Sequence, residues 1–224
     1  MTKEELLKVA KPILFNTDMV KAILEGRKTA TRRLIKPQPT KNMIHKLGFC
    51  VDGDKKDIGK FGFGSHECGG HVRYVKPPYL PGDVLYVRET WVDWSCAECE
   101  DECVADNGSG YCDAPKYLYR ATHETTDKGW KPSIHMPKEA ARIFLKVKDV
   151  RVERLQEIDD KGAYMEGAGE PNTVYQLGAR VCEFAKIWQS TIKKEDIDTY
   201  GWDANPYVWV IEFERIEVNV DKQD

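Results

Sequence analysis

Short stretches of the chain alternate apolar and polar side chains, and this period of two residues is typical of strands with one buried face. In the longest stretch, Ile143, Leu145 and Val147 fall on the same face. The last stretch alternates in the same way up to Ile216. The pattern predicts five strands, over residues 12–15, 84–91, 117–121, 142–155 and 207–216.

Apolar residues at spacings of three and four predict three helices. The first starts at Thr17, a suitable N-cap, and ends before Gly26, which suits a left-handed C-terminal position. The second is capped by Asp159 and reaches Glu166. The third follows an apolar stripe over residues 174–188. These helices are short and separated by strands, which is typical of an α+β fold.

Residues 36–82 are rich in glycine, proline and lysine, and their apolar positions keep no sustained period. This composition predicts an insertion or long loops. A second insert, over residues 92–116, is rich in cysteine. We therefore expect one domain over residues 1–224, with insertions at about 36–80 and 92–116. Hydrophobic patterning does not distinguish a partly closed barrel from an open sheet.

Composition narrows the class of protein. The 224 residues are 41% hydrophobic and 32% charged, as in ordinary globular proteins. A net charge of −3 argues against a protein that coats nucleic acid through its global field, so nucleic-acid contact requires a local patch. The N-terminal segment lacks the apolar core of a signal peptide, and no run approaches the ~18 apolar residues of a membrane span. We expect a cytoplasmic protein with no membrane partner.

Such a patch follows the first helix, where residues 26–33 contain one lysine, two threonines and three arginines. A threonine hydroxyl needs a base to become a nucleophile, and a lysine serves if burial or nearby positive charge lowers its pKa. Lys28 and Thr31 can meet only if the chain bends, because they would point to opposite faces of a strand. The plainer interpretation is a solvated strand end, in which the threonines favour β structure.

The same segment carries a family resemblance. Residues 23–32 resemble the opening motif of ASCH domains, a branch of the PUA-like β-barrels associated with RNA. Three further segments fit the same family. Its turn and strand resemble residues 81–87, its helix ending in Glu-Gly resembles residues 163–167, and its last strand resembles residues 207–213. The resemblance implies an α+β, PUA-like small β-barrel with flanking helices. Residues 131–137 and 202–206 resemble tailed-phage members, which implies a phage or prophage origin and a bacterial host cell.

The resemblance also implies a chemistry. In the family's bacterial N4-acetylcytidine amidohydrolase, a lysine and a threonine of the matching motif are catalytic with a glutamate from the Glu-Gly helix. Carried onto this chain, Thr31 is the nucleophile, Lys28 its base, and Glu166 a proton shuttle or the residue that orients Lys28. This chain departs from the enzyme at Ala30, which is smaller, and in having two arginines after Thr31. These departures and the long insertions favour a larger substrate, such as a modified base within a polynucleotide.

An alternative is a binding module of the same fold without chemistry, in which arginines hold phosphates and an aromatic side chain stacks on a base. Trp202, in a loop, is the best stacking candidate. Glu89 is a carboxylate on an apolar strand, so it pairs with Lys28 or an arginine, or else lies at a solvated strand end. The candidate residues for binding RNA or a nucleoside are Arg27, Thr29, Arg32, Arg33, Glu89 and Trp202.

The cysteine-rich insert predicts a metal site. Cys96, Cys99, Cys103 and Cys112 give four thiolates within seventeen positions, which suffices for a closed, structural Zn²⁺ site. The insert has few large apolar residues, so metal ligation would replace a core. Cys68 or His71 could substitute for a ligand or join a second site, and unligated thiols are the remaining alternative. A third hypothesis is a zinc-stabilised interaction module whose insert contacts a phage or host protein.

Overall fold

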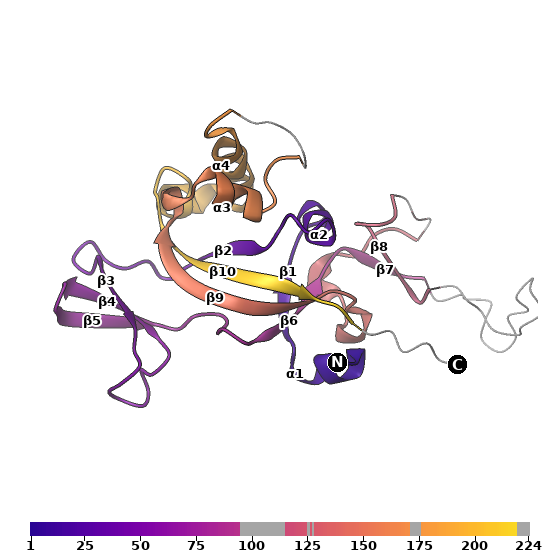
Figure 1. Cartoon of the computed structure of the whole chain (residues 1–224). Helices are drawn as coiled ribbons and strands as arrows, with labels where there is room; N and C mark the ends of the chain where they lie inside the picture. The colour runs from indigo at the N-terminus through magenta and orange to yellow at the C-terminus, as the bar shows by residue number, and fades with distance from the viewer. Residues whose placement is uncertain (95–114, 125, 127, 171–175, 219–224) are drawn as a thin grey trace, which may run out of the picture. The chain divides into compact units, whose positions relative to one another are not determined.

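The structure is a computed structural model, and it describes residues 1–94, 115–124, 126, 128–170 and 176–218 (Figure 1). It is a mixed α+β protein with several sheets and few helices, as the hydrophobic pattern predicts. The helices are α1 (Lys3–Val9), α2 (Thr17–Leu24), α3 (Asp160–Met165), α4 (Ala179–Thr191) and α5 (Ile197–Tyr200). The strands are β1 (Lys11–Leu14), β2 (Ala30–Leu34), β3 (His45–Phe49), β4 (Phe61–His66), β5 (Gly69–Val75), β6 (Val84–Arg88), β7 (Trp91–Asp93), β8 (Tyr117–Tyr119), β9 (Phe144–Arg154) and β10 (Tyr207–Ile216).

The chain forms two compact units, each built from separate stretches of sequence. The first unit comprises Met1–Glu25, Val84–Leu145 and Arg215–Asp224. In it, β1 runs parallel to β6, with Lys11 opposite Leu85, and β7 pairs with β8 in antiparallel fashion. Its core combines α1, β6, β7, β8 and the segment that leads into β9, through Leu6, Tyr86, Trp91, Tyr119, Met136, Ala140 and Phe144.

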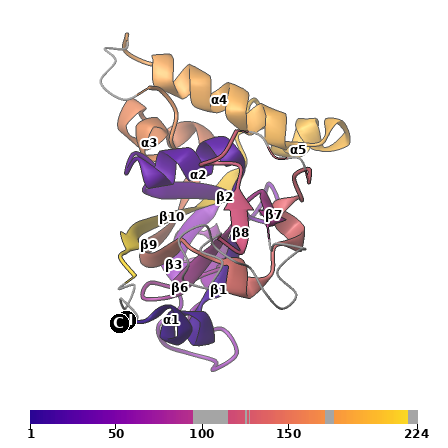
Figure 2. The ribbon, with the colours of Figure 1, turned by 90° about the vertical axis from the view of Figure 1, so that its right-hand side faces the viewer.

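The second unit comprises Gly26–Asp83 and Lys146–Glu214. Within it, β10 lies between β9 and β2, and it pairs with β2 in antiparallel fashion. Helices α3 and α4 lie side by side (Figure 2) and pack on Val208 and Val210 of β10. Alternate residues of β10 point the other way, and the Trp209 ring lies 6.1 Å from Phe61 of the antiparallel sheet β3–β4–β5.

Strand β2 therefore has two distinct faces, which its register with β10 identifies. Arg32 is opposite Val210, so it shares the face that α3 and α4 cover. Thr31 is opposite Ile211 and Arg33 is opposite Trp209, so both belong to the other face. Of the cationic segment 26–33, residues 30–33 thus form the start of an edge strand, and residues 26–29 lead into it.

Three details differ from the sequence predictions. Asn16, rather than Thr17, caps α2, because its side chain accepts a hydrogen bond from the backbone N–H of Met19 at 2.8 Å. Residues 36–82 include the three strands of the β3–β4–β5 sheet, whose many glycines hide the alternation of apolar residues. Within the described ranges the strands form three sheets that do not close into a barrel.

No helix in those ranges is both long and apolar enough to cross a membrane.

Candidate functional site

The backbone at Lys28 and Thr29 is fixed from two sides. The N–H of Thr29 donates to the carbonyl of Met165, the last residue of α3, at 2.9 Å. The carbonyl of Thr29 accepts from the N–H of Phe213 in β10 at 2.8 Å. The chain therefore turns before β2 begins at Ala30, and it places the Lys28 side chain at the edge of this strand, beside the end of α3.

The Lys28 ammonium is enclosed by oxygen atoms. It donates to the carbonyl of Ala30 at 2.8 Å, to the carbonyl of Glu166 at 2.7 Å and to Oε2 of Glu166 at 2.8 Å. These acceptors engage all three N–H donors of a lysine side chain. The Lys28 side chain is 0% exposed and that of Glu166 is 4% exposed, so the pair is an interior salt bridge.

Arg32 adds a second cation to the same carboxylate. Its NH1 lies 3.3 Å from Oε1 of Glu166, and its NH2 lies 2.9 Å from Oε2 of Glu153 on β9. The Arg32 side chain is buried, and its Nε has no hydrogen-bond partner within the described part of the chain. Lys28, Arg32, Glu153 and Glu166, here called the edge cluster, thus join β2, β9 and the end of α3.

Burial has the largest effect on the pKa of Lys28. It lowers the pKa of Lys28 below its ordinary value, although the Glu166 carboxylate opposes this change. The positive charges of Arg33 and Arg32 lower the Lys28 pKa further. Burial also lowers the pKa of Arg33, whose charge interacts with Tyr79 and Glu166. The Lys28 amine is therefore easier to deprotonate than an ordinary lysine.

Thr31, the predicted nucleophile, is buried on β2 with 3% exposure. Strand alternation directs its side chain with Arg33 to the face opposite Arg32. The Lys28 ammonium lies between these faces, because it binds the carbonyl of Ala30 at the strand edge. The structure thus brings Lys28 and Glu166 into direct contact, and it places Thr31 on the neighbouring face.

The other predicted binding residues have different surroundings. Arg27 donates through NH1 to the carbonyls of Gly167 and Gly169 at 2.9 and 3.0 Å, and so holds the turn after α3. Thr29 contributes its backbone, as described above. The half-buried Trp202 ring packs 6.3 Å from the Phe184 ring of α4.

Glu89 lies in the first unit and is only 1% exposed. Its two carboxylate oxygens each accept from Arg142, from Nε and NH2, at 2.9 Å. Arg142 also donates to Oγ1 of Thr122 at 3.2 Å and lies 4.0 Å from the centre of the Tyr119 ring. The inference that this carboxylate requires a cationic partner is sound, but the partner, Arg142, was not identified from the sequence.

The predicted zinc ligands Cys96, Cys99, Cys103 and Cys112 lie outside the described residues. Within the ranges that the structure does describe, no group of three His, Cys, Asp or Glu residues is placed to hold a metal ion. Cys68, the proposed substitute ligand, is exposed at the turn between β4 and β5. The zinc site therefore rests on the cysteine spacing.

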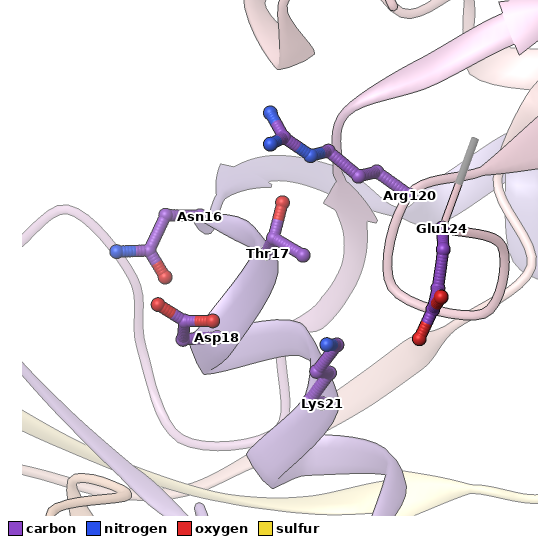
Figure 3. A pocket seen from close by; sticks show the side chains of 6 residues that line it. All are labelled: Asn16, Thr17, Asp18, Lys21, Arg120 and Glu124. Carbon is purple, nitrogen blue, oxygen red and sulfur yellow. The ribbon is translucent and has the colours of Figure 1, made fainter. Parts of the chain in front are cut away.

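A cavity of about 450 Å³ lies in the first unit, between the first turn of α2 and the segment after β8 (Figure 3). Its lining residues are Asn16, Thr17, Asp18, Lys21, Arg120 and Glu124. The two cations and two carboxylates balance one another. None of the residues proposed for catalysis or nucleic-acid binding lines this cavity.

Comparisons of the chain with protein-family models, with curated proteins and with solved structures find no match. The resemblance to the ASCH family therefore stays a prediction that rests on the sequence motifs. The edge cluster and strand β2, which carries its member Arg32, are the features that point to a function.

Proposed function

We propose that this chain is an ASCH-type protein of PUA-like ancestry that binds RNA or a modified nucleobase beside the Lys28–Glu166 pair. The observation that carries the proposal is the direct contact of these two side chains in the protein interior, at 2.8 Å. Residues 163–167 and 23–32 are far apart in the sequence, and each resembles a separate motif of the family. Their meeting at one strand edge supports a common site.

The energetics of the pair also support a functional role. Removing two charges from water costs several kcal/mol per ion, and apolar residues of similar volume are often at least as stable at such positions. A buried lysine with a lowered pKa beside a carboxylate is the kind of group that functional sites contain. On the face shared with Thr31, the half-buried Arg33 supplies a cation for a phosphate group.

Binding is tested with a short single-stranded RNA. We expect wild-type binding to weaken as salt is added, because phosphate contacts release counterions. Arg33→Gln should reduce the slope of log affinity against log salt by about one, as expected for one lost phosphate contact. Fluorescence anisotropy at several salt concentrations measures this. Lys146→Gln, which removes an exposed charge of β9, is the matched control. Equal slopes for the wild type and Arg33→Gln would refute this role of Arg33.

A second candidate function, hydrolysis of an N4-acyl amide on cytidine, is favoured by the Lys28–Glu166 contact. A neutral Lys28 would take the Thr31 proton while Thr31 Oγ1 forms a bond to the acyl carbon. The C–N bond would then break as the proton passes to the departing amine, and water would hydrolyse the threonine ester to release the acid. Glu166, in contact with Lys28, would accept or return a proton between these steps.

This activity predicts that the protein releases cytidine and acetate from N4-acetylcytidine. Lys28→Met should lower the rate at least 100-fold, the usual contribution of a general base. Thr31→Val should do the same by removing the hydroxyl. Chromatography of the nucleosides measures both, with Lys146→Gln as the control. Release of cytidine by Thr31→Val at the wild-type rate would exclude the threonine mechanism, and no release by the wild type would exclude the activity.

The cysteine-rich insert belongs to this proposal as a structural zinc-binding element. Four cysteine ligands would leave no open coordination position, so the metal would stabilise the insert rather than take part in chemistry. The alternative of a zinc-stabilised module that binds a phage or host protein gains no support from the described residues, because the insert lies outside them.

A further inference from the structure

Beyond the Lys28–Glu166 pair, charged side chains of alternating sign continue along the second unit. Glu153 accepts from Arg32 NH2 at 2.9 Å through Oε2 and from Arg151 Nε at 2.6 Å through Oε1. Arg151 in turn donates through NH1 to Glu212 of β10 at 2.5 Å. The order of contacts is Lys28, Glu166, Arg32, Glu153, Arg151 and Glu212.

Burial falls along this series as far as Arg151, and Glu212 at its end is 31% exposed. The side chains of Lys28, Arg32 and Glu166 are 0%, 3% and 4% exposed, that of Glu153 is 19% exposed, and that of Arg151 is 40% exposed. The three most buried side chains carry two positive charges and one negative charge. Glu153 supplies the missing negative charge at the boundary between the buried and exposed parts.

The geometry at Arg32 shows how this charge acts. The guanidinium is divided between two carboxylates, with the shorter contact, 2.9 Å, to Glu153 and the longer, 3.3 Å, to Glu166. Glu166 consequently presents Oε1 to Arg32 through a single nitrogen and keeps Oε2 for Lys28. Without Glu153, Arg32 could turn both nitrogens to Glu166, which is the favoured bidentate geometry, and would compete with Lys28.

We infer that Glu153 is a positioning residue for the Lys28–Glu166 pair, and that it acts by holding Arg32. Its relevance to ligand binding or catalysis rests on the proposed function, whereas its effect on Lys28 does not. The charged groups that act on Lys28 directly include Glu166, Arg33 and Arg32. Glu153 acts on Lys28 through the last of these.

The test is an NMR titration of the Lys28 side chain in the full-length protein labelled at its lysines, with Lys28→Arg to assign the signal. In Glu153→Gln, the lost negative charge and the competition from Arg32 both disfavour the ammonium form. We therefore expect the midpoint of the Lys28 titration to move to lower pH than in the wild type. An unchanged midpoint would overturn the inference.

Glu212→Gln is the matched control, because it removes the same charge from the same series of contacts, one arginine further from Arg32. It should leave the Lys28 midpoint unchanged, and an equal shift in both variants would overturn the inference in favour of a general charge effect. If Glu153→Gln does not fold, Arg151→Gln provides the test. This variant keeps the Arg32–Glu153 contact, so the Lys28 midpoint should not fall below that of the wild type. A lower midpoint in Arg151→Gln would contradict the inference. The titration contains no ligand, so its result tests the role of Glu153 even if the protein proves not to bind RNA or hydrolyse N4-acetylcytidine.

Discussion

Replacing Glu166 with Gln is expected to lower the free energy of unfolding by about 3 kcal/mol, the range measured when one partner of a buried ion pair is removed. The Glu166 carboxylate contacts the Lys28 ammonium at 2.8 Å and also faces Arg32. Glutamine keeps the shape and one acceptor oxygen but removes the charge. Two buried cations would then share the remaining negative charge of Glu153.

Urea denaturation monitored by tryptophan fluorescence measures this change. The matched control is Glu214→Gln, because Glu214 is 51% exposed and pairs with Lys148 at the surface. Surface pairs contribute about 0–1 kcal/mol, so the control should be nearly neutral. A loss in Glu166→Gln no greater than that of the control would show that the buried pair does not hold α3 to β2.

The double variant Lys28→Met with Glu166→Leu separates stability from function. Apolar residues of similar volume often replace buried ion pairs without loss of stability. We therefore expect this variant to be more stable than Glu166→Gln alone, while it should lack the proposed activity. The pair would then be retained for its chemistry or for ligand binding, and its structural contribution could be replaced.

Much of the fold follows from local sequence signals. The terminal strand was predicted at residues 207–216 and is observed at Tyr207–Ile216, because its alternation is long and uninterrupted. The N-cap of α3 was predicted at Asp159, whose side chain accepts from the N–H of Gly162 at 2.6 Å. In both cases the signal that predicts the element lies within a short stretch of sequence.

The sheet over residues 45–75 was not predicted, for a physical reason. Gly62 and Gly64 occupy positions of β4 at which an apolar side chain would have marked a buried face. A Cβ at Gly62 would meet Tyr74, Val72 and Leu47 at 3.4–3.5 Å, so neighbouring strands fill that space. The burial is provided by cross-strand side chains, which a linear pattern does not show.

The candidate site was predicted in part. Family resemblance connected Lys28, Thr31 and Glu166, and the structure joins the first and the last of them. The sequence did not indicate Glu153 or Arg142, because they meet Arg32 and Glu89 across 121 and 53 residues. Neither belongs to a recognised motif. An isolated charged residue carries no local signal of its partner, so ion pairs of this kind emerge only from the fold.

The second large effect is expected in the first unit, where Arg142→Met should lower the free energy of unfolding by about 3–4 kcal/mol. The substitution leaves the Glu89 carboxylate, 1% exposed, without its bidentate partner. It also removes the hydrogen bond from Arg142 to Thr122 and the stacking of Arg142 on Tyr119. Through these contacts and Glu89, Arg142 connects β8 and the turn after it to the end of β6. Both losses destabilise the same region.

Arg120→Gln is the matched control, because Arg120 is an exposed arginine that follows β8. Like surface substitutions generally, it should lower the free energy of unfolding by less than about 0.5 kcal/mol. A double-mutant cycle of Glu89→Gln and Arg142→Met isolates the pair, and a coupling of about 1–3 kcal/mol is expected for side chains in direct contact. Coupling near zero would mean that Arg142 acts through Tyr119 and Thr122 alone. In that case Glu89 would tolerate substitution, and its burial would reflect packing rather than the ion pair.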